Sequence, residues 1–190
     1  GTNWTEVADL NTARRLLAAA GTDNTSALAI AGGIPAISNV ELWNGSSWTA
    51  VNDVGTARYQ LMGAGTTTSA LIASGDPSPT AALTESWNGT SWTEVNDLNT
   101  GRKDAGGSGT DNTSALIFGG DGVSKLTATE EWNGVSWAET SDLNTAVGSI
   151  GGTGTAASAL AFGGETPGGQ TAATEEWNVP SFTTKTISTD

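Results

Sequence analysis

A single sequence motif recurs four times along the chain, and its spacing constrains the fold more than any other feature. Each copy joins a Glu, a Trp, an Asn and a second aromatic residue, at 41–48, 85–92, 130–137 and 175–182. The second aromatic lies at positions 4, 48, 92, 137 and 182, so successive copies are 44 or 45 residues apart. A repeat of this length is typical of propellers and other repeat proteins, in which each unit buries its apolar face against its neighbours.

The composition excludes several classes of function. The 190-residue chain has 7 basic and 20 acidic side chains, and its net charge of −13 opposes binding to DNA or RNA. It contains no Cys and no His, which excludes disulfides, thiolate metal sites and Cys–His or Ser–His catalysis. No apolar run is long enough to span a bilayer, so we expect no membrane insertion. We also expect no cofactor, and the acidic, Lys-poor composition predicts an extracellular or virion location.

The third repeat indicates how one unit folds. Residues 103–109 are small, residues 110–113 have the composition of a turn, and residues 114–118 are an apolar run of strand length. Residues 126–132 alternate toward a Trp, and Asn133-Gly134 is the dipeptide favoured in type I′ turns, where both central residues have positive φ. A returning strand then completes a four-stranded antiparallel meander, which is the size of one propeller blade.

The chain is therefore predicted to be one all-β domain, residues 1–190, built as a β-propeller of four blades with four antiparallel strands each. The repeat units cover about 8–48, 52–92, 96–137 and 141–178. The first strand of each unit is rich in Gly and Ala. Because first strands line the axis of a propeller, small residues there favour a narrow axis and few blades. The alternative is a Gly-rich strand that merely curves.

The two ends of the chain predict how the ring closes. Residues 3–7 are an extra copy of the fourth strand, and the last unit has Asn178-Val179-Pro180 where the others have an Asn-Gly turn. Pro removes a backbone donor, so the last unit is predicted not to fold its own fourth strand tightly. We expect residues 3–7 to complete the last blade and close the ring, leaving residues 181–190 as a tail or a loose edge strand. The alternatives are a longer propeller of which this chain is a part, or two copies that share one ring.

The unit resembles the kelch repeat. The match consists of the Gly-Gly after the second strand, the Glu two positions before an aromatic residue, the final Trp, and an Arg before the first strand at Arg14, Arg58 and Arg102. The chain departs from that pattern in having Trp-Asn where Tyr-Asp is usual, and Val147 where a fourth Arg would stand. Its motifs Trp-Asn-Gly-x-Ser-Trp and Asp-Leu-Asn-Thr-Ala-Arg are also similar to the kelch-like repeats of structural proteins of marine bacteriophages. The resemblance implies a propeller that acts as a binding module.

Two recurring residue types have both a functional and a structural interpretation. The Trp residues could form a sugar-stacking platform, but their strict repetition favours packing between blades. The recurring Glu residues could form a ring of carboxylates for a cation, but the favoured interpretation is a buried carboxylate that accepts backbone amides or pairs with Arg. These residues are Glu41, Glu85, Glu130 and Glu175. We predict no metal site and no catalytic residue.

Candidate ligand-binding residues lie at two places. Arg14, Arg58 and Arg102 could converge at one mouth of the axis and hold a carboxylate, a sulfate or a sialic acid. Pairing with the Asp residues five positions earlier is the favoured alternative. These are Asp9, Asp53, Asp97 and Asp142. The other candidates lie in or beside the loops between second and third strands, which vary while the frame repeats, at Asp76, Asp121, Lys125 and Glu165. The loops cover residues 34–39, 77–81, 121–125 and 165–170.

The sequence favours a non-catalytic module. An enzyme needs a tuned acid, base, nucleophile or metal. The copper oxidases built on kelch propellers need Tyr, His and Cys, and this chain has only Tyr59, so that activity is excluded. A sialidase would need Tyr59 beside a Glu and more units than four, so it is much less favoured. The leading hypothesis is a structural or interaction module on or near a phage particle, with protein, surface glycan or other virion chains as partners. The alternatives are a lectin, with one pocket per blade and an exposed Trp or Tyr, and a scaffold with no ligand.

Overall fold

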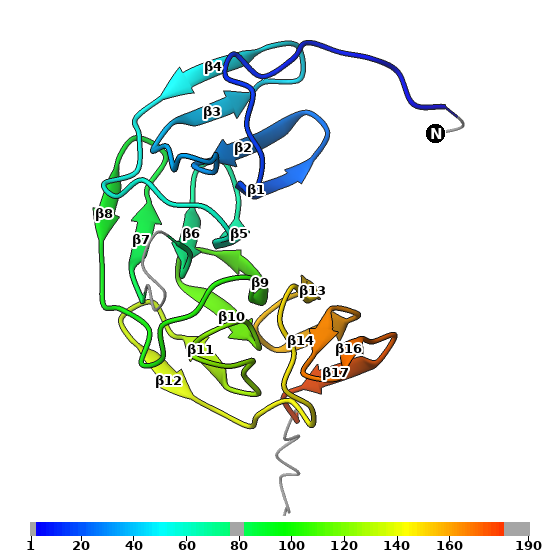
Figure 1. Cartoon of the computed structure of the whole chain (residues 1–190). Helices are drawn as coiled ribbons and strands as arrows, with labels where there is room; N and C mark the ends of the chain where they lie inside the picture. The colour runs from blue at the N-terminus through cyan, green and yellow to red at the C-terminus, as the bar shows by residue number, and fades with distance from the viewer. Residues whose placement is uncertain (1–2, 77–81, 181–190) are drawn as a thin grey trace, which may run out of the picture.

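The computed structural model describes residues 3–76 and 82–180. Within them the chain forms strands and loops, and no helix there is able to cross a bilayer. The strands make three four-stranded antiparallel sheets, one three-stranded sheet and a two-stranded hairpin. The four larger sheets follow one another along an arc that is open on one side (Figure 1). The predicted all-β class is confirmed, as is the four-stranded unit in the first three repeats.

Each of the first three sheets is a meander whose strands pair in chain order. The first sheet contains β1 (Ala18–Asp23), β2 (Ser26–Ile30), β3 (Val40–Trp43) and β4 (Trp48–Val51). The second contains β5 (Met62–Gly65), β6 (Ala70–Ala73), β7 (Thr84–Trp87) and β8 (Trp92–Glu94). The third contains β9 (Gly106–Asp111), β10 (Ser114–Phe118), β11 (Thr129–Trp132) and β12 (Trp137–Glu139).

Among the described residues, the fourth sheet has one strand fewer than the other three. It pairs β13 (Gly151–Gly154) with β14 (Ser158–Phe162), and β14 with β17 (Thr174–Asn178). The loop predicted over 165–170 is itself a small hairpin of β15 (Glu165–Thr166) and β16 (Gly169–Gln170). The fourth unit therefore reproduces the first three strands of the repeat and adds a hairpin between the second and the third.

The turn between third and fourth strands brings two indoles together. In the third sheet Trp132 pairs with Trp137, and their ring centroids are 5.4 Å apart. The predicted type I′ turn is wrong, because Gly134 has a φ of +90° while Asn133 does not have a positive φ. The Asn133 side chain instead accepts hydrogen bonds from the N–H groups of Val135 and Ser136 at 2.9 and 3.0 Å. These hydrogen bonds to the side-chain oxygen of Asn133 stabilise the turn, so Asn133 does not need a positive φ.

Glycine allows the first strands of successive sheets to approach closely. The inner strands stack in the order β1, β5, β9 and β13. A Cβ atom on Gly152 would lie 2.6 Å from Cζ of Phe118 and 2.8 Å from the backbone of Gly107 in the preceding sheet. Gly63 and Gly107 face the preceding sheet in the same way. The small residues of the first strands are therefore required by sheet-to-sheet packing, which the curved-strand alternative did not foresee.

The apolar core lies between neighbouring sheets. Strand β10 is buried on both faces from Ala115 to Phe118 because it has a sheet on either side. Four indoles are buried, at Trp43, Trp87, Trp132 and Trp137. Trp48, Trp92 and Trp177 are partly buried. The predicted packing of Trp between sheets is confirmed for Trp87, Trp92, Trp132, Trp137 and Trp177, which lie in the apolar clusters between neighbouring sheets. Trp43 and Trp48 instead pack against each other within the first sheet, and Trp4 is exposed.

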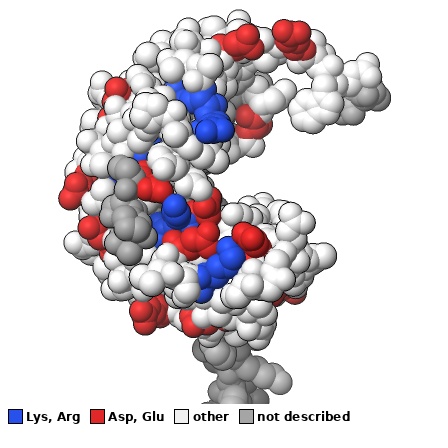
Figure 2. Space-filling model, in the orientation of Figure 1, with Lys and Arg blue, Asp and Glu red and all other residues white. Residues whose placement is uncertain are grey.

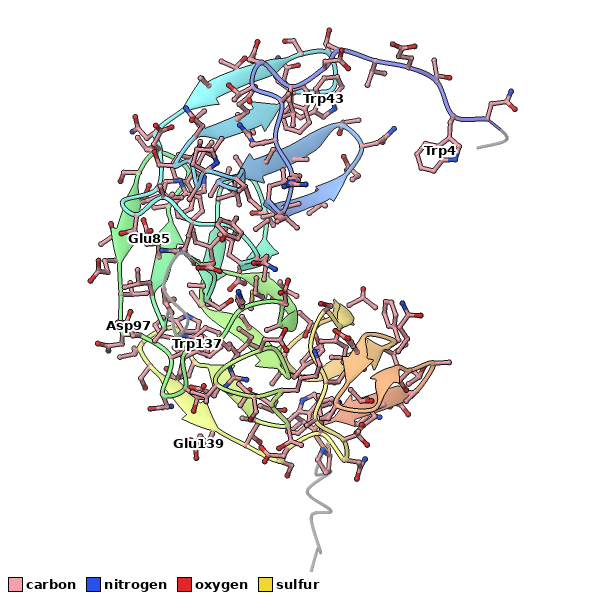
Figure 3. All side chains as sticks on the ribbon, viewed as in Figure 1. Trp4, Trp43, Glu85, Asp97, Trp137 and Glu139 are labelled. Atoms are coloured by element: carbon pink, nitrogen blue, oxygen red, sulfur yellow. The ribbon has the colours of Figure 1, made fainter. Side chains whose placement is uncertain are left out.

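The predicted closure of a ring by residues 3–7 is not seen in this structure. These residues belong to no strand, and the Trp4 side chain is fully exposed. Figure 3 shows Trp4 at the end of a segment that leads away from all four sheets. The tail predicted over 181–190 and the loop predicted over 77–81 lie outside the described residues. The four sheets thus form an open arc with one free face at each end.

Candidate interaction surface

The three arginines predicted to converge at a mouth of the axis are buried in ion pairs. Arg14 pairs with Glu41 at 2.9 Å and Arg58 with Glu85 at 3.0 Å, and at most 4% of any of these side chains is exposed. Arg102 pairs with Glu130 at 2.7 Å and also donates to the carbonyl oxygens of the buried loop around it. The predicted structural role of the recurring Glu is confirmed for these three residues, and none of the three Arg side chains reaches a surface.

The glutamates also fix the segment that enters each sheet. The N–H of Asn99 donates to Oε2 of Glu130 at 2.7 Å, and its side-chain amide donates to the same oxygen and to the carbonyl of Trp137. Asn11 makes the same three bonds to Glu41 and Trp48. Burial raises the pKa of Glu41, but the bonds from Asn11 and Thr12 and the charge of Arg14 outweigh that effect, so its pKa lies below the ordinary value.

The predicted pairing of Arg with the preceding Asp residues is wrong. Asp97 instead accepts a hydrogen bond from the N–H of Thr84 at 3.2 Å, at the start of β7. Asp53 and Asp142 accept from the matching N–H groups of Val40 and Thr129. A carboxylate two or three residues beyond the fourth strand thereby caps the third strand of its own sheet. In the fourth sheet Glu175 accepts the same two bonds from Asn144, but Val147 occupies the position of the Arg that pairs with the Glu in the other sheets.

The remaining candidates lie together on one face of the arc, at the end of the sheets where the first strands begin. The residue two positions before each first strand has a left-handed backbone in all four units, with φ between 50° and 58° at Leu16, Gln60, Asp104 and Ser149. Beside these residues, Asp76 bridges to Tyr59, Asp121 to Lys103 and Glu165 to Gly148 through their backbones. The charged side chains at this end form what we call the charged rim, consisting of Asp76, Lys103, Asp104, Asp121, Lys125 and Glu165. Figure 2 shows acidic and basic side chains next to one another on this face.

The charged rim links neighbouring sheets through exposed or half-buried ion pairs. Lys103 contacts Asp76 at 2.8 Å, and Lys125 contacts both Asp121 and Glu165 at 3.2 Å. The hydrogen bond and charge of Asp76 raise the pKa of Lys103 despite its partial burial. Burial raises the pKa of Asp104, and the charge of Asp121 adds to this, while a hydrogen bond from Gln60 partly opposes it. The predicted residues Asp76, Asp121, Lys125 and Glu165 are thus brought together, and the structure adds Lys103, Asp104 and Gln60.

The added residues carry no repeat signal. They directly follow the position of the recurring Arg, but the residue pair there differs from unit to unit. It is Tyr59-Gln60, Lys103-Asp104 or Gly148-Ser149. The loops between second and third strands also vary in sequence while the residues around them repeat. The same reasoning, applied just after Arg58 and Arg102, would have found them.

The opposite end of the first strands encloses a shallow groove of about 300 Å³. Small side chains and backbone line it, among them Ala20, Gly65, Ser108 and Thr153. The narrow axis predicted from the small residues is consistent with this lining. The groove offers few side-chain functional groups, and no cluster of three or more carboxylates able to hold a metal occurs within residues 3–76 and 82–180.

The paired indoles of the first three sheets are packed against each other, and one of each pair is bonded within its own repeat unit. In each of the first three sheets the Trp of the third strand donates its indole N–H to a backbone carbonyl of the same repeat, as Trp87 does to Thr67 at 2.9 Å. Both rings of each pair are at least partly buried. A lectin with one exposed indole per blade predicts the opposite arrangement.

The chain matches no known protein family model, and no curated protein matches it.

Proposed function

We propose that the chain is a non-catalytic interaction module that presents the charged rim on a rigid stack of sheets. The observation that carries this proposal is the use made of the recurring polar residues. Arg102, Glu130 and Asn99 all bond within the protein, and their counterparts in the first sheet do the same. The residues that differ between units, such as Lys103, Lys125 and Glu165, gather at the rim. Recognition usually resides in variable groups held by a fixed frame.

The finer architecture that we propose is kelch-like, in which each sheet is a propeller blade and the last blade takes its fourth strand from a segment with the sequence of residues 3–7, of the same chain or of another copy. The stacking of first strands and the burial of indoles between sheets support it. The similarity of the repeat to kelch-like units of phage structural proteins supports a place on or near a virion, with another virion chain or a surface glycan as partner. The negative charge and the polar rim fit a partner in an extracellular medium.

The proposal is tested by photo-crosslinking in an extract of the source cells or particles. A photoreactive residue at Gln170, on the rim hairpin, is expected to give one discrete cross-linked species, while the same residue at Thr93, exposed on β8, is expected to give none. The cross-linked species should be lost when Lys125→Glu is introduced. The thermal unfolding of this variant is measured as well, so that loss of the species can be separated from loss of the fold. Equal labelling from both positions would contradict a rim interface. Binding to a printed glycan array that survives Lys125→Glu would favour the lectin instead.

A further inference from the structure

A cavity between the third and fourth sheets lies where the preceding interface holds an indole. At the preceding interface, the ring of Trp137 from β12 packs against the second sheet, and its indole N–H donates to the hydroxyl of Thr84 at 3.0 Å. The fourth sheet has no such strand within the described residues. In its place lies a cavity of about 170 Å³, and Thr129, which is the counterpart of Thr84, lines it. Leu116, Ala159 and Trp177 form its apolar walls.

The cavity also keeps the polar groups that hold a fourth strand elsewhere. Asn99 donates its side-chain amide to the carbonyl of Trp137 at 3.2 Å, and Asn11 donates to that of Trp48 at 3.0 Å. Asn144 occupies the same position beside the empty cavity and bonds Glu175 as its counterparts bond their own Glu. A strand whose first residue is Trp would therefore find an acceptor for its indole N–H and a donor for its first carbonyl.

Residues 4–7 have the sequence required for that strand. They read Trp-Thr-Glu-Val, which is identical to residues 92–95, where β8, the fourth strand of the second sheet, begins. The segment that follows is already in the position it takes after a fourth strand, because Asn11 bonds Glu41 at 2.8 Å as Asn99 bonds Glu130 at 2.7 Å. Residues 4–7 are thus directed toward a sheet seated on the free face of the first sheet. Phe182, the other aromatic in this register, has no N–H to offer Thr129.

The two free faces of the arc are complementary in the same sense. In the third sheet Leu116 and Phe118 are covered by the fourth sheet, with 1% and 2% of their surface exposed. Their counterparts Leu160 and Phe162 on the outer face of the fourth sheet are 40% and 44% exposed. The opposite end presents Ala19, which is exposed and stands where Gly63 and Gly107 face the preceding sheet. One end lacks a following sheet and the other lacks a preceding one.

We propose that the strand Trp4–Val7 of one copy completes the fourth sheet of a second copy. Trp4 would lie opposite Trp177, Thr5 opposite Glu176 and Glu6 opposite Glu175, in the register that pairs Trp137 with Trp132 in the third sheet. This addition seats the first sheet of one copy on Leu160 and Phe162 of the other. It leaves the open arc of each chain unchanged, whereas pairing within one chain requires the ends of the arc to meet (Figure 1). The contact is head-to-tail and removes an exposed sheet edge.

This inference rests on the blade architecture proposed above and not on the charged rim. A negative result in the following experiment would therefore leave the proposal of rim binding unaffected. The chain has no cysteine, so any disulfide that forms must join the cysteines that are introduced. Thr5→Cys and Glu176→Cys chains, purified separately, mixed and oxidised, are expected to form a disulfide-linked species of twice the 19.1 kDa chain mass. The matched control mixes Thr5→Cys with Glu131→Cys, because Glu131 already faces Ala138 of its own fourth strand. That mixture should give no linked species.

Three further arms decide the source of the strand. Trp4→Ala should abolish cross-linking and the concentration-dependent mass of the wild-type chain in sedimentation, while Trp4→Phe should weaken both. A chain carrying Thr5→Cys and Glu176→Cys together that links internally, without a gain in mass, would overturn the proposal in favour of ring closure by one chain. Cross-linking that appears only after residues 181–190 are removed would show that the tail fills the cavity, and would overturn it too. Absence of any link would do the same.

Discussion

The hydroxyl of Thr84 accepts a hydrogen bond at 3.0 Å from the indole N–H of Trp137, across the interface between the second and third sheets. The same interface between the first and second sheets lacks this bond, since Val40 stands where Thr84 does. The indole nitrogen of Trp92 is accordingly buried without a partner within the described residues. The indole N–H thus has a partner where the facing residue carries a hydroxyl and has none where that residue carries a methyl group instead.

Val40→Thr is therefore expected to stabilise the protein, although Val-to-Thr changes in a core usually destabilise. The new hydroxyl would accept from Trp92, and a hydrogen bond of this kind contributes about 1 kcal/mol. Urea unfolding of Val40→Thr, Trp92→Phe and the double variant measures the coupling. The gain should disappear in the Trp92→Phe background. A loss of stability in Val40→Thr of the same size in both backgrounds would show that the two groups do not meet.

Gly152→Ala is expected to destabilise the protein by about 1–3 kcal/mol, because its Cβ would overlap Phe118 and the backbone of Gly107. Gly168→Ala is the matched control, since the only atom near its Cβ lies 3.6 Å away, at Oγ1 of Thr166. Thermal unfolding of both variants separates close packing from a general effect of removing glycine. Equal melting temperatures for the two would contradict the close approach of β9 and β13.

Much of the fold could be predicted because the repeat sets both the strand pattern and the packing. The indoles at Trp87 and Trp132 recur at fixed spacing, and a residue that recurs in every unit serves a contact that recurs. The partner of Arg58 could not be chosen in this way, since Asp53 and Glu85 recur equally well. Only the fold shows that the distant Glu85 lies beside it. The rim residues Gln60 and Lys103 differ between units, so no period marks them.

The pH dependence of stability follows from Glu41. Its pKa is lower in the folded protein than the ordinary value, which is about 4.3 in an unfolded chain. The ionised carboxylate therefore contributes stability that is fully present above about pH 5 and is lost as the pH falls through the folded pKa. Glu41→Gln should be less stable than the wild type at pH 7, with a difference that shrinks below about pH 4. Guanidinium unfolding at several pH values measures it, and a difference independent of pH would contradict this assignment.

The central claim is that the recurring charged residues hold the sheets together and are not available for a ligand. The most direct test is the free energy of unfolding of Arg102→Ala against Arg15→Ala, in which a buried and an exposed arginine are removed from equivalent segments. Loss of Arg102 leaves Glu130 charged and buried, so we expect a cost of about 3–5 kcal/mol, and less than about 0.5 kcal/mol for Arg15. Equal, small costs for the two variants would contradict the claim.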